Sequence, residues 1–152
     1  MQKTVATFNE AEIDDVAVGM SASYSRTISD ADIKSYAVLS GDNNPIHLID
    51  EYASESRFGK RIAHGLMSAG YFSALFGTSL PGTGCVYVSQ SLNFRRAVYI
   101  GDTVVATITV TSVDRERKRA IFDTVCKVRG KVVIDGVAEI YVPGKKNREG
   151  IC

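Results

Sequence analysis

The densest group of reactive side chains lies in the stretch Ser40-Gly41-Asp42-Asn43-Asn44-Pro45-Ile46-His47. It holds a carboxylate, Asp42, and one of only two histidines in the chain, His47. Because Gly41 and Pro45 disfavour a helix, we expect an irregular segment on which both side chains can face one water molecule. A carboxylate beside an imidazole is suited to general acid–base chemistry near neutral pH.

A second candidate feature is Gly65, at the start of the longest predicted helix, residues 65–78. Apolar or small residues surround nearly the whole circumference of that helix, which predicts a buried element. The unpartnered N–H of Gly65 and the helix dipole would stabilise a developing negative charge, and the missing Cβ would allow close approach. Ser73 is a hydroxyl on this apolar helix, and it needs a partner, either its own i−4 carbonyl or the site.

The elements that must position these residues follow from periodicity and from breaks in the chain. Residues 22–28 alternate as a strand, Ser29 and Asp30 offer N-caps for a helix that ends near Gly41, and Asp50 would cap a short helix over 50–56. Four further strands are predicted, over residues 84–94, 103–113, 119–128 and 132–142. This order predicts a single α+β domain in which long antiparallel strands surround one buried helix.

Composition sets broad limits on the function. The 152 residues are 45% hydrophobic, enough for one domain with a substantial core, so we treat 1–152 as one domain and expect residues 144–152 to fray. A net charge of +1 favours neither nucleic acid nor an anionic membrane. Residues 1–10 lack the apolar core of a signal peptide, and no apolar run is long enough to span a bilayer. We therefore expect a soluble cytoplasmic protein.

The three cysteines, Cys85, Cys126 and Cys152, are far apart and form no C-x-x-C pair. This spacing suggests neither a disulfide framework nor a thiolate zinc site. We expect Cys85 and Cys126 to fill the core as small apolar side chains on strands.

Beyond these patterns, the chain resembles the MaoC-like group of (R)-specific enoyl-CoA hydratases. The resemblance covers about residues 20–143. It rests on Tyr36-x-x-Leu39-Ser40-Gly41-Asp42-x-Asn44-Pro45-Ile46-His47 and on Ile62-Ala63-His64-Gly65-Leu66. Gln90-Ser91-Leu92-Asn93-Phe94 and Val98-x-x-Gly101-Asp102-Thr103 are similar to later parts of the family pattern, although Ala97 replaces a usual proline.

The resemblance implies a hot-dog fold, a curved antiparallel sheet wrapped around a long helix, and the hydration of trans-2-enoyl thioesters. It further implies that Asp42 and His47 are catalytic and that the Gly65 amide is the oxyanion donor. We favour His47 as the base and Asp42 as the group that orients water and exchanges the second proton; the opposite division remains open. Asn44 would hold the loop, and Ser73 aligns with a serine near the dyad in family members.

The substrate would be a thioester of coenzyme A or of a phosphopantetheine carrier protein, with no further cofactor. Ala63 and His64 are candidate contacts for it, with His64 favoured as a structural residue. Arg95-Arg96 and Arg57-x-x-Lys60-Arg61 could meet its phosphates or could be ordinary solvated surface. Two histidines and one aspartate could ligate zinc, but this chemistry needs no Lewis acid, so we expect no metal.

Three alternatives to the hydratase stay within the fold: a dehydratase acting on an acyl carrier protein, a thioesterase, and a module that binds acyl chains without turnover. The pair Asp42 and His47 argues against the last two. A transcriptional or scaffold role finds no support in the neutral charge. Hot-dog domains generally pair edge to edge, so we expect a homodimer.

Overall fold

A six-stranded antiparallel sheet forms the body of the molecule in the computed structural model, which describes residues 9–145. Five strands pair in the order β1-β4-β5-β6-β2, and the short β3 also pairs with β6. The strands are β1 (Ser21–Thr27), β2 (Val86–Gln90), β3 (Asn93–Phe94), β4 (Thr103–Asp114), β5 (Arg119–Val128) and β6 (Lys131–Tyr141). Consecutive hairpins join β4 to β5 and β5 to β6. β2 and β3 pair with β6 and not with the next strand, β4, which pairs with β1 instead.

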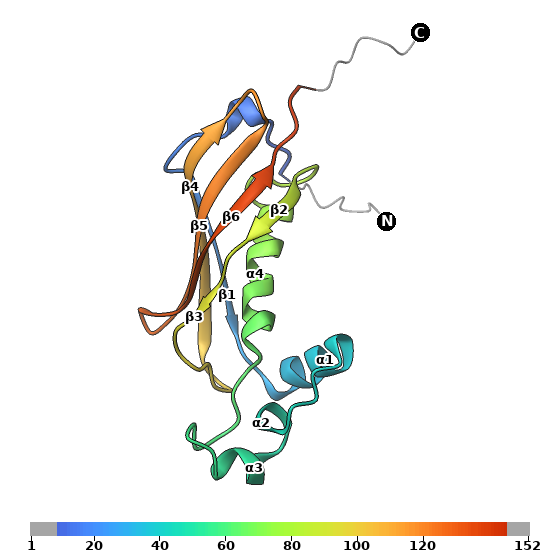
Figure 1. The fold of residues 1–152 in the computed structure, drawn as a ribbon, viewed down its shortest axis with the longest axis vertical. Coiled ribbons are helices and arrows are strands. Elements are labelled where there is room, and N and C mark those ends of the chain that lie inside the picture. Colours follow the sequence, from blue (N-terminus) through green and yellow to red (C-terminus); the bar gives the residue numbers. More distant parts are fainter. Residues whose placement is uncertain (1–8, 146–152) are drawn as a thin grey trace, which may run out of the picture.

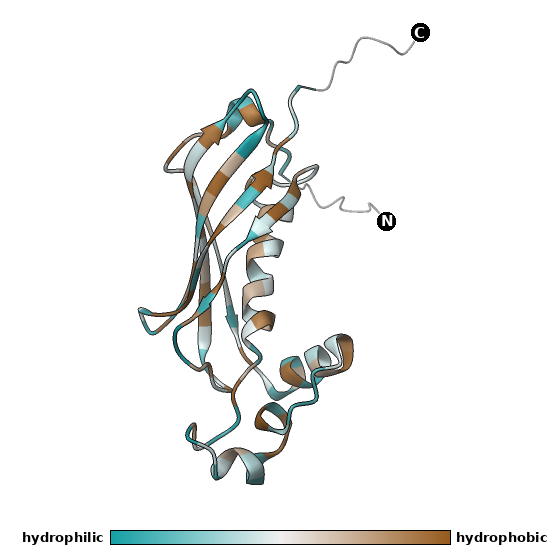
Figure 2. Ribbon diagram, viewed as in Figure 1, coloured by the Kyte–Doolittle hydropathy of each residue, from teal (hydrophilic) through white to brown (hydrophobic). Residues whose placement is uncertain are grey.

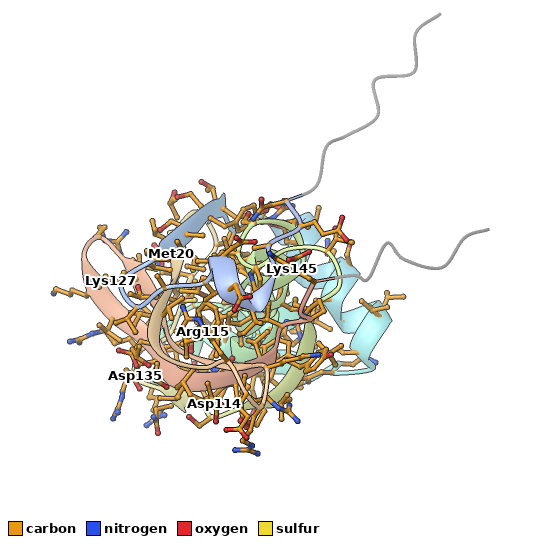
Figure 3. The ribbon with its side chains drawn as sticks, turned by 90° about the horizontal axis from the view of Figure 1, so that it is seen from above. Met20, Asp114, Arg115, Lys127, Asp135 and Lys145 are labelled. Atoms are coloured by element: carbon orange, nitrogen blue, oxygen red, sulfur yellow. The ribbon has the colours of Figure 1, made fainter. Side chains whose placement is uncertain are left out.

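The sheet curves around one helix, α4 (Gly65–Thr78), which lies along its inner side (Figure 1). Viewed from above, the sheet wraps around the helix and Lys127 points outward from it (Figure 3). The ring of Phe76 on α4 meets Phe122 on β5 edge to face, with centroids 4.8 Å apart, and both side chains are buried. These features confirm the predicted hot-dog architecture.

Alternation along the central strands explains why the sheet has one apolar inner face. On β4, Val104, Ala106, Ile108 and Val110 are buried, whereas the residues between them are exposed or half-buried. Successive side chains of a strand point to opposite faces, so a period of two sends one set to the helix and the other to solvent. Figure 2 shows the resulting mixture of polar and apolar positions along the strands.

Three short helices, together with the loops between them, form a separate segment at one end of the sheet, below α4 in Figure 1. They are α1 (Asp30–Ser40), α2 (Pro45–Leu48) and α3 (Asp50–Ser54); a 3-10 turn, η1 (Ile13–Asp15), precedes β1. The predicted N-cap Ser29 accepts from the Asp32 N–H at 3.1 Å, and Asp32 accepts in return from the Ser29 N–H. This capping box fixes the start of α1.

Two sequence predictions about the elements are wrong in detail. The expected strand over 84–94 is divided into β2 and β3, with Ser91 and Leu92 outside both, and a bulge at Tyr87/Ser89 shifts the register within β2. Asp50 is the first residue of α3, not its N-cap, which is Ile49 with no side-chain cap.

The long helix is not buried on all sides, contrary to the prediction from its composition. Its inner face is buried through Ser68, Phe72, Leu75 and Phe76. Its opposite side is exposed and carries small or apolar residues in the described chain: Leu66, Gly70, Ser73, Ala74 and Gly77.

Cys126 has the predicted place in the core on a strand, whereas Cys85 only packs against the core and lies outside the strands. Cys126 is buried on β5, and burial raises its pKa to about 12, so its thiol stays protonated. Cys85 is half-buried just before β2, and both are free thiols. Cys152, residues 1–8 and tail residues 146–152 lie outside the described range. Of the helices between residues 9 and 145, none has the length and apolar content needed to cross a bilayer.

Candidate active site

Asp42 lies in the short loop between α1 and α2, and its backbone is held from both sides. Gly41 ends α1 in the left-handed conformation with φ of 79°, and the Ser40 Oγ accepts from the Asp42 N–H at 3.1 Å. The Asp42 Oδ1 accepts from the Asn44 N–H at 3.2 Å, which makes a local Asx turn. The carboxylate remains about half exposed, so water can reach its other oxygen.

His47 lies in the helical turn α2, which corrects the expectation that Pro45 keeps this stretch irregular. Proline fits the first position of a helix because its missing N–H would have no helical partner there. The Asn44 Oδ1 accepts from the Ile46 N–H at 3.2 Å and caps the turn. Only the loop between α1 and α2 is therefore irregular, and not the whole stretch from Gly41 to His47 that the sequence predicts.

The two titratable side chains face each other across a short gap. The His47 Nε2 is 3.9 Å from the Asp42 Oδ2, too far for a direct hydrogen bond but suited to one shared water. The His47 Nδ1 lies 2.7 Å from the carbonyl oxygen of Ile62, which can only accept, so Nδ1 is the donor. In the neutral ring this leaves the lone pair on Nε2, directed at the gap.

Burial sets the charge state of His47, which is only 8% exposed. Removal from water lowers the pKa of this imidazole below its ordinary 6.5, more than the Ile62 hydrogen bond and the Asp42 charge raise it. The ring is therefore neutral at pH 7 and can take a proton at Nε2.

Gly65 is the first residue of α4 and lies beside this gap, since one cavity is lined by both dyad residues and by Gly65. The first N–H groups of a helix have no partner within it, and His64 at the N-cap supplies no side-chain bond. A Cβ at Gly65 would lie 2.6 Å from ring atoms of Phe94, so glycine is needed for this ring to pack against the helix start. The geometry offers a base, a carboxylate and an anion-stabilising amide around one space.

Comparison with known proteins shows the family of the chain. The pattern of the MaoC like domain matches residues 15–137. The chain belongs to the MaoC-like family.

Its relatives include proteins of similar length that are named as a hydratase and a dehydratase. The chain is 52% identical to the (R)-specific enoyl-CoA hydratase of Rhodospirillum rubrum over 87% of this chain and 92% of that protein. It is 45% identical to the 3-hydroxybutyryl-CoA dehydratase of Methylorubrum extorquens, over 91% and 88% of the two chains. The solved (R)-hydratase of A. caviae superimposes with a TM-score of 0.82 at 35% identity, covering 84% of this chain and 98% of that one.

His64 contacts both Asp42 and His47, the pair called the dyad here. Its ring stacks on that of His47, with centroids 3.8 Å apart, and packs on Tyr36 on the other side. Its Nε2 lies 3.0 Å from the Asp42 carbonyl oxygen and therefore donates to it. His64 is only 2% exposed, so its ring supports Asp42 and His47 from the interior of the protein. The neighbouring Ala63 is buried and lines a cavity that also contains Gly65.

A metal site would use the same three side chains. One ligand atom from each of Asp42, His47 and His64 lies within 4.8 Å of the others. However, the two imidazoles are nearly parallel, at 27°, so their in-plane lone pairs do not converge well on one point. One nitrogen of each ring already donates to a carbonyl. The absence of a catalytic metal remains a prediction.

Arg61 is a site residue whose role the sequence analysis missed, since it was grouped with surface cations that could meet phosphate. It is 8% exposed, its Nε donates to the His47 carbonyl at 2.6 Å, and its Nη2 donates to the Asp30 carboxylate at 2.6 Å. It ties the turn that carries His47 to the start of α1. The sequence hint is its place directly before the apolar pair Ile62-Ala63, where a free surface cation is not expected.

The three other arginines that were predicted to meet phosphate line one cavity of about 290 Å³, beside His47 and Gly65. They are Arg57, Arg95 and Arg96. Arg95 already makes a two-pronged ion pair with Asp135, at 3.0 and 3.3 Å, which lowers the pKa of that carboxyl. Arg96 has no ion pair within residues 9–145, so it is the better placed of the two for a phosphate.

Ser73 is not brought to the dyad within this chain. It lies on the exposed side of α4 and lines none of the cavities that contain Asp42 or His47. Among the described residues it has no hydrogen-bond partner, so the bond to its own i−4 carbonyl is not formed. Its supporting role remains a prediction that would need a second subunit.

Proposed function

We propose that this chain is an (R)-specific enoyl-CoA hydratase, a hydro-lyase that adds water reversibly to trans-2-enoyl-CoA to give (R)-3-hydroxyacyl-CoA. Its relatives named as (R)-specific enoyl-CoA hydratase and 3-hydroxybutyryl-CoA dehydratase support this assignment. The observation that carries it is the pair of atoms Asp42 Oδ2 and His47 Nε2, 3.9 Å apart and beside the Gly65 amide.

These groups are sufficient for the reaction. One water lies between the carboxylate and the neutral imidazole, and His47 Nε2 takes its proton as the oxygen bonds to C3. The electron pair of the C2–C3 double bond moves toward the thioester oxygen, where the Gly65 N–H and the start of α4 stabilise the negative charge. The proton then goes to C2, directly from the imidazolium or through Asp42, so both groups end unchanged. Exchanging the roles of Asp42 and His47 gives the same balance of atoms.

The reaction needs no cofactor in this scheme, because the thioester itself activates the double bond. Asn44 keeps the dyad loop in place through its cap on α2. The enzyme would act in the cytoplasm, where acyl-CoA thioesters are available to it.

A homodimer is the proposed assembly. The exposed side of α4 carries apolar or small side chains, and the edge strand β2 exposes Val86, Tyr87 and Val88. Exposed apolar surface beside an unpaired strand edge favours association of two copies. Light scattering should give about twice the 16.5 kDa of one chain, and a 16.5 kDa species alone would contradict the dimer.

Crotonyl-CoA tests the function directly. Loss of the enoyl-thioester absorbance after mixing with the protein would report hydration, and the product should be oxidised by an (R)-specific, not an (S)-specific, 3-hydroxyacyl-CoA dehydrogenase. No absorbance change with crotonyl-CoA or with longer enoyl-CoA thioesters would exclude the assignment.

A second candidate is a dehydratase that acts on carrier-protein thioesters. It is favoured by 38% identity to a mitochondrial 3-hydroxyacyl-[acyl-carrier-protein] dehydratase of Arabidopsis thaliana, over 78% of this chain and 72% of that protein. The same dyad would serve, and only the carrier would differ. Parallel assays with crotonyl-CoA and a crotonyl carrier protein separate the two candidates.

A further inference from the structure

We propose that a second cavity, lined by Arg96, Tyr99, Arg129 and Lys131, binds the phosphorylated nucleotide end of coenzyme A. This inference rests on the proposed function and extends it, because it selects free acyl-CoA over a carrier-protein thioester. The cavity has a volume of about 280 Å³ and lies between the 96–102 loop and the turn joining β5 to β6.

The second cavity adjoins the one at the dyad. Arg96 and Ala97 line both, so they form a shared wall between the space at Gly65 and the space at the β5–β6 turn. A thioester with its carbonyl at the Gly65 amide would send its pantetheine arm along the first cavity past Phe94. The end of that arm would then meet the second cavity at Arg96.

The charge of the second cavity suits a phosphate ligand. Arg96 and Lys131 are exposed and make no ion pair within the described part of the chain. Arg129 pairs with Asp102 at 3.0 Å, and the Lys60 Nζ lies over the ring of Tyr99, 4.7 Å from its centroid. Several cations around one concave space favour a ligand with several negative charges, which each cation can meet with a charge-assisted hydrogen bond.

Among residues 9–145, the one carboxylate that lines the cavity is already engaged. Asp102 is 7% exposed, its Oδ1 accepts from Arg129, and its Oδ2 accepts from the Tyr99 N–H at 2.9 Å. It therefore orients Arg129 at the rim and does not present a free negative charge to a phosphate. The uncompensated charge in the cavity is that of Arg96 and Lys131.

This charge pattern matches coenzyme A better than a carrier protein. Coenzyme A ends in a nucleotide with a diphosphate and a 3′-phosphate, and a phosphomonoester carries about −1.5 to −2 charges at pH 7. A carrier protein holds its pantetheine through one phosphodiester and has no such nucleotide. A compact cationic cavity at the end of the arm therefore favours the nucleotide.

The test compares crotonyl-CoA with crotonyl-pantetheine, which has the same reacting group and no nucleotide. For the wild type, kcat/KM should be higher with crotonyl-CoA. In the double variant Arg96→Gln/Lys131→Gln, the ratio of the two kcat/KM values should fall roughly tenfold, mainly through the KM for crotonyl-CoA. Arg129 is left intact, because its removal would strand the buried Asp102.

A matched control removes two positive charges elsewhere. Lys145 follows β6, and Arg117 lies in the turn between β4 and β5, at the end of the sheet opposite the β5–β6 turn (Figure 1). Lys145→Gln/Arg117→Gln should leave the ratio within about twofold of the wild type, since distant surface charges are screened. An equal fall in both double variants would reduce the effect to net charge and overturn the nucleotide site.

Two other results would overturn the proposal. One is an unchanged ratio in the cavity variant Arg96→Gln/Lys131→Gln, and the other is a higher kcat/KM with a crotonyl carrier protein than with crotonyl-CoA. If the wild type hydrates none of these thioesters, the proposed function fails, and calorimetry with coenzyme A and pantetheine still tests the site. The cavity variant should then bind coenzyme A about tenfold more weakly than the wild type and the control; equal affinities would contradict the site.

Discussion

The body of the molecule and the segment that carries the dyad are held by different forces. The sheet and α4 bury a continuous apolar core, with side chains such as Phe72, Ile108 and Phe122 fully enclosed. The segment from α1 to Arg61 has few buried side chains, and hydrogen bonds made by side chains hold it in place. They include the bonds from Arg61 to the His47 carbonyl and to Asp30, and the contact between His47 Nδ1 and Ile62.

This difference suggests a division of work. Hydrophobic burial is nondirectional and scales with area, so it stabilises the fold without requiring precise side-chain positions. Hydrogen bonds have preferred lengths and directions, so they can fix the angle of an imidazole while leaving its reactive face open to water. The dyad can therefore change without large loss of stability, and the core can change only at high cost.

The largest expected effect on stability comes from a substitution in the core of the sheet and α4. Phe122→Ala removes a fully buried ring that packs on Phe76 and should lower the free energy of unfolding by about 3–5 kcal/mol. Urea denaturation followed by circular dichroism would measure it. The variant should keep near-normal kcat wherever it remains folded, and a loss of kcat in the folded protein would contradict the separation of the two regions.

A smaller effect is expected from the polar tie beneath the dyad. Arg61→Met leaves the His47 carbonyl without its donor and should cost about 1–3 kcal/mol of stability. Because the turn that carries His47 is then loose, kcat should also fall, by roughly tenfold. Denaturation and steady-state kinetics measure the two losses.

The matched control is Arg61→Lys, which keeps the charge but cannot donate from two positions in a fixed fork. It should recover part of the stability and less of the kcat. A methionine variant with normal kcat would show that Arg61 only supports the fold.

Gly65→Ala should affect catalysis at the helix start while leaving the body intact. The new Cβ would overlap the ring of Phe94, a side chain that is 54% exposed and can move aside. The amide remains, so kcat/KM for crotonyl-CoA should fall only about tenfold, below the loss expected when an oxyanion donor is removed. An unchanged kcat/KM in this variant would remove Gly65 from the site.

The smallest expected effect is the dependence of stability on pH that comes from His47. Burial lowers the pKa of His47 below 6.5, so the unfolded chain takes up this proton at a higher pH than the folded one. The contribution of His47 should make stability decline as the pH falls below about 6.5. The low-pH limb of kcat/KM should have its midpoint below 6.5, at the folded pKa. Stability curves of wild type and His47→Gln, compared from pH 5 to 8, check the sign: a loss of stability as pH rises would contradict it.

Local sequence information predicted much of the fold and of the site. The Ser29 cap, the helix end near Gly41, the alternating strands and the helix from Gly65 depend on neighbouring residues, and all appear in the structure. The reactive pair was also visible, because Asp42 and His47 lie five residues apart.

The remaining features depend on contacts between distant parts of the chain. Arg61 meets Asp30 across 31 positions, and Phe94 on β3 reaches Gly65 at the start of α4. The apolar pair after Arg61 is only a weak local hint of burial, and so Arg61 was grouped with cations that meet phosphate or lie on solvated surface. The helical turn at His47 was missed because proline was treated only as a helix breaker, although it fits the first position of a helix.

The most direct test measures activity and stability together in Asp42→Asn and His47→Gln. Hydration of crotonyl-CoA should fall by about 10² or more in each variant, because each loses an acid–base group. At pH 8, where His47 is neutral in both states, the free energy of unfolding should change by less than about 1 kcal/mol. A variant that keeps most of its hydration activity would contradict the assignment of these two residues as the catalytic pair.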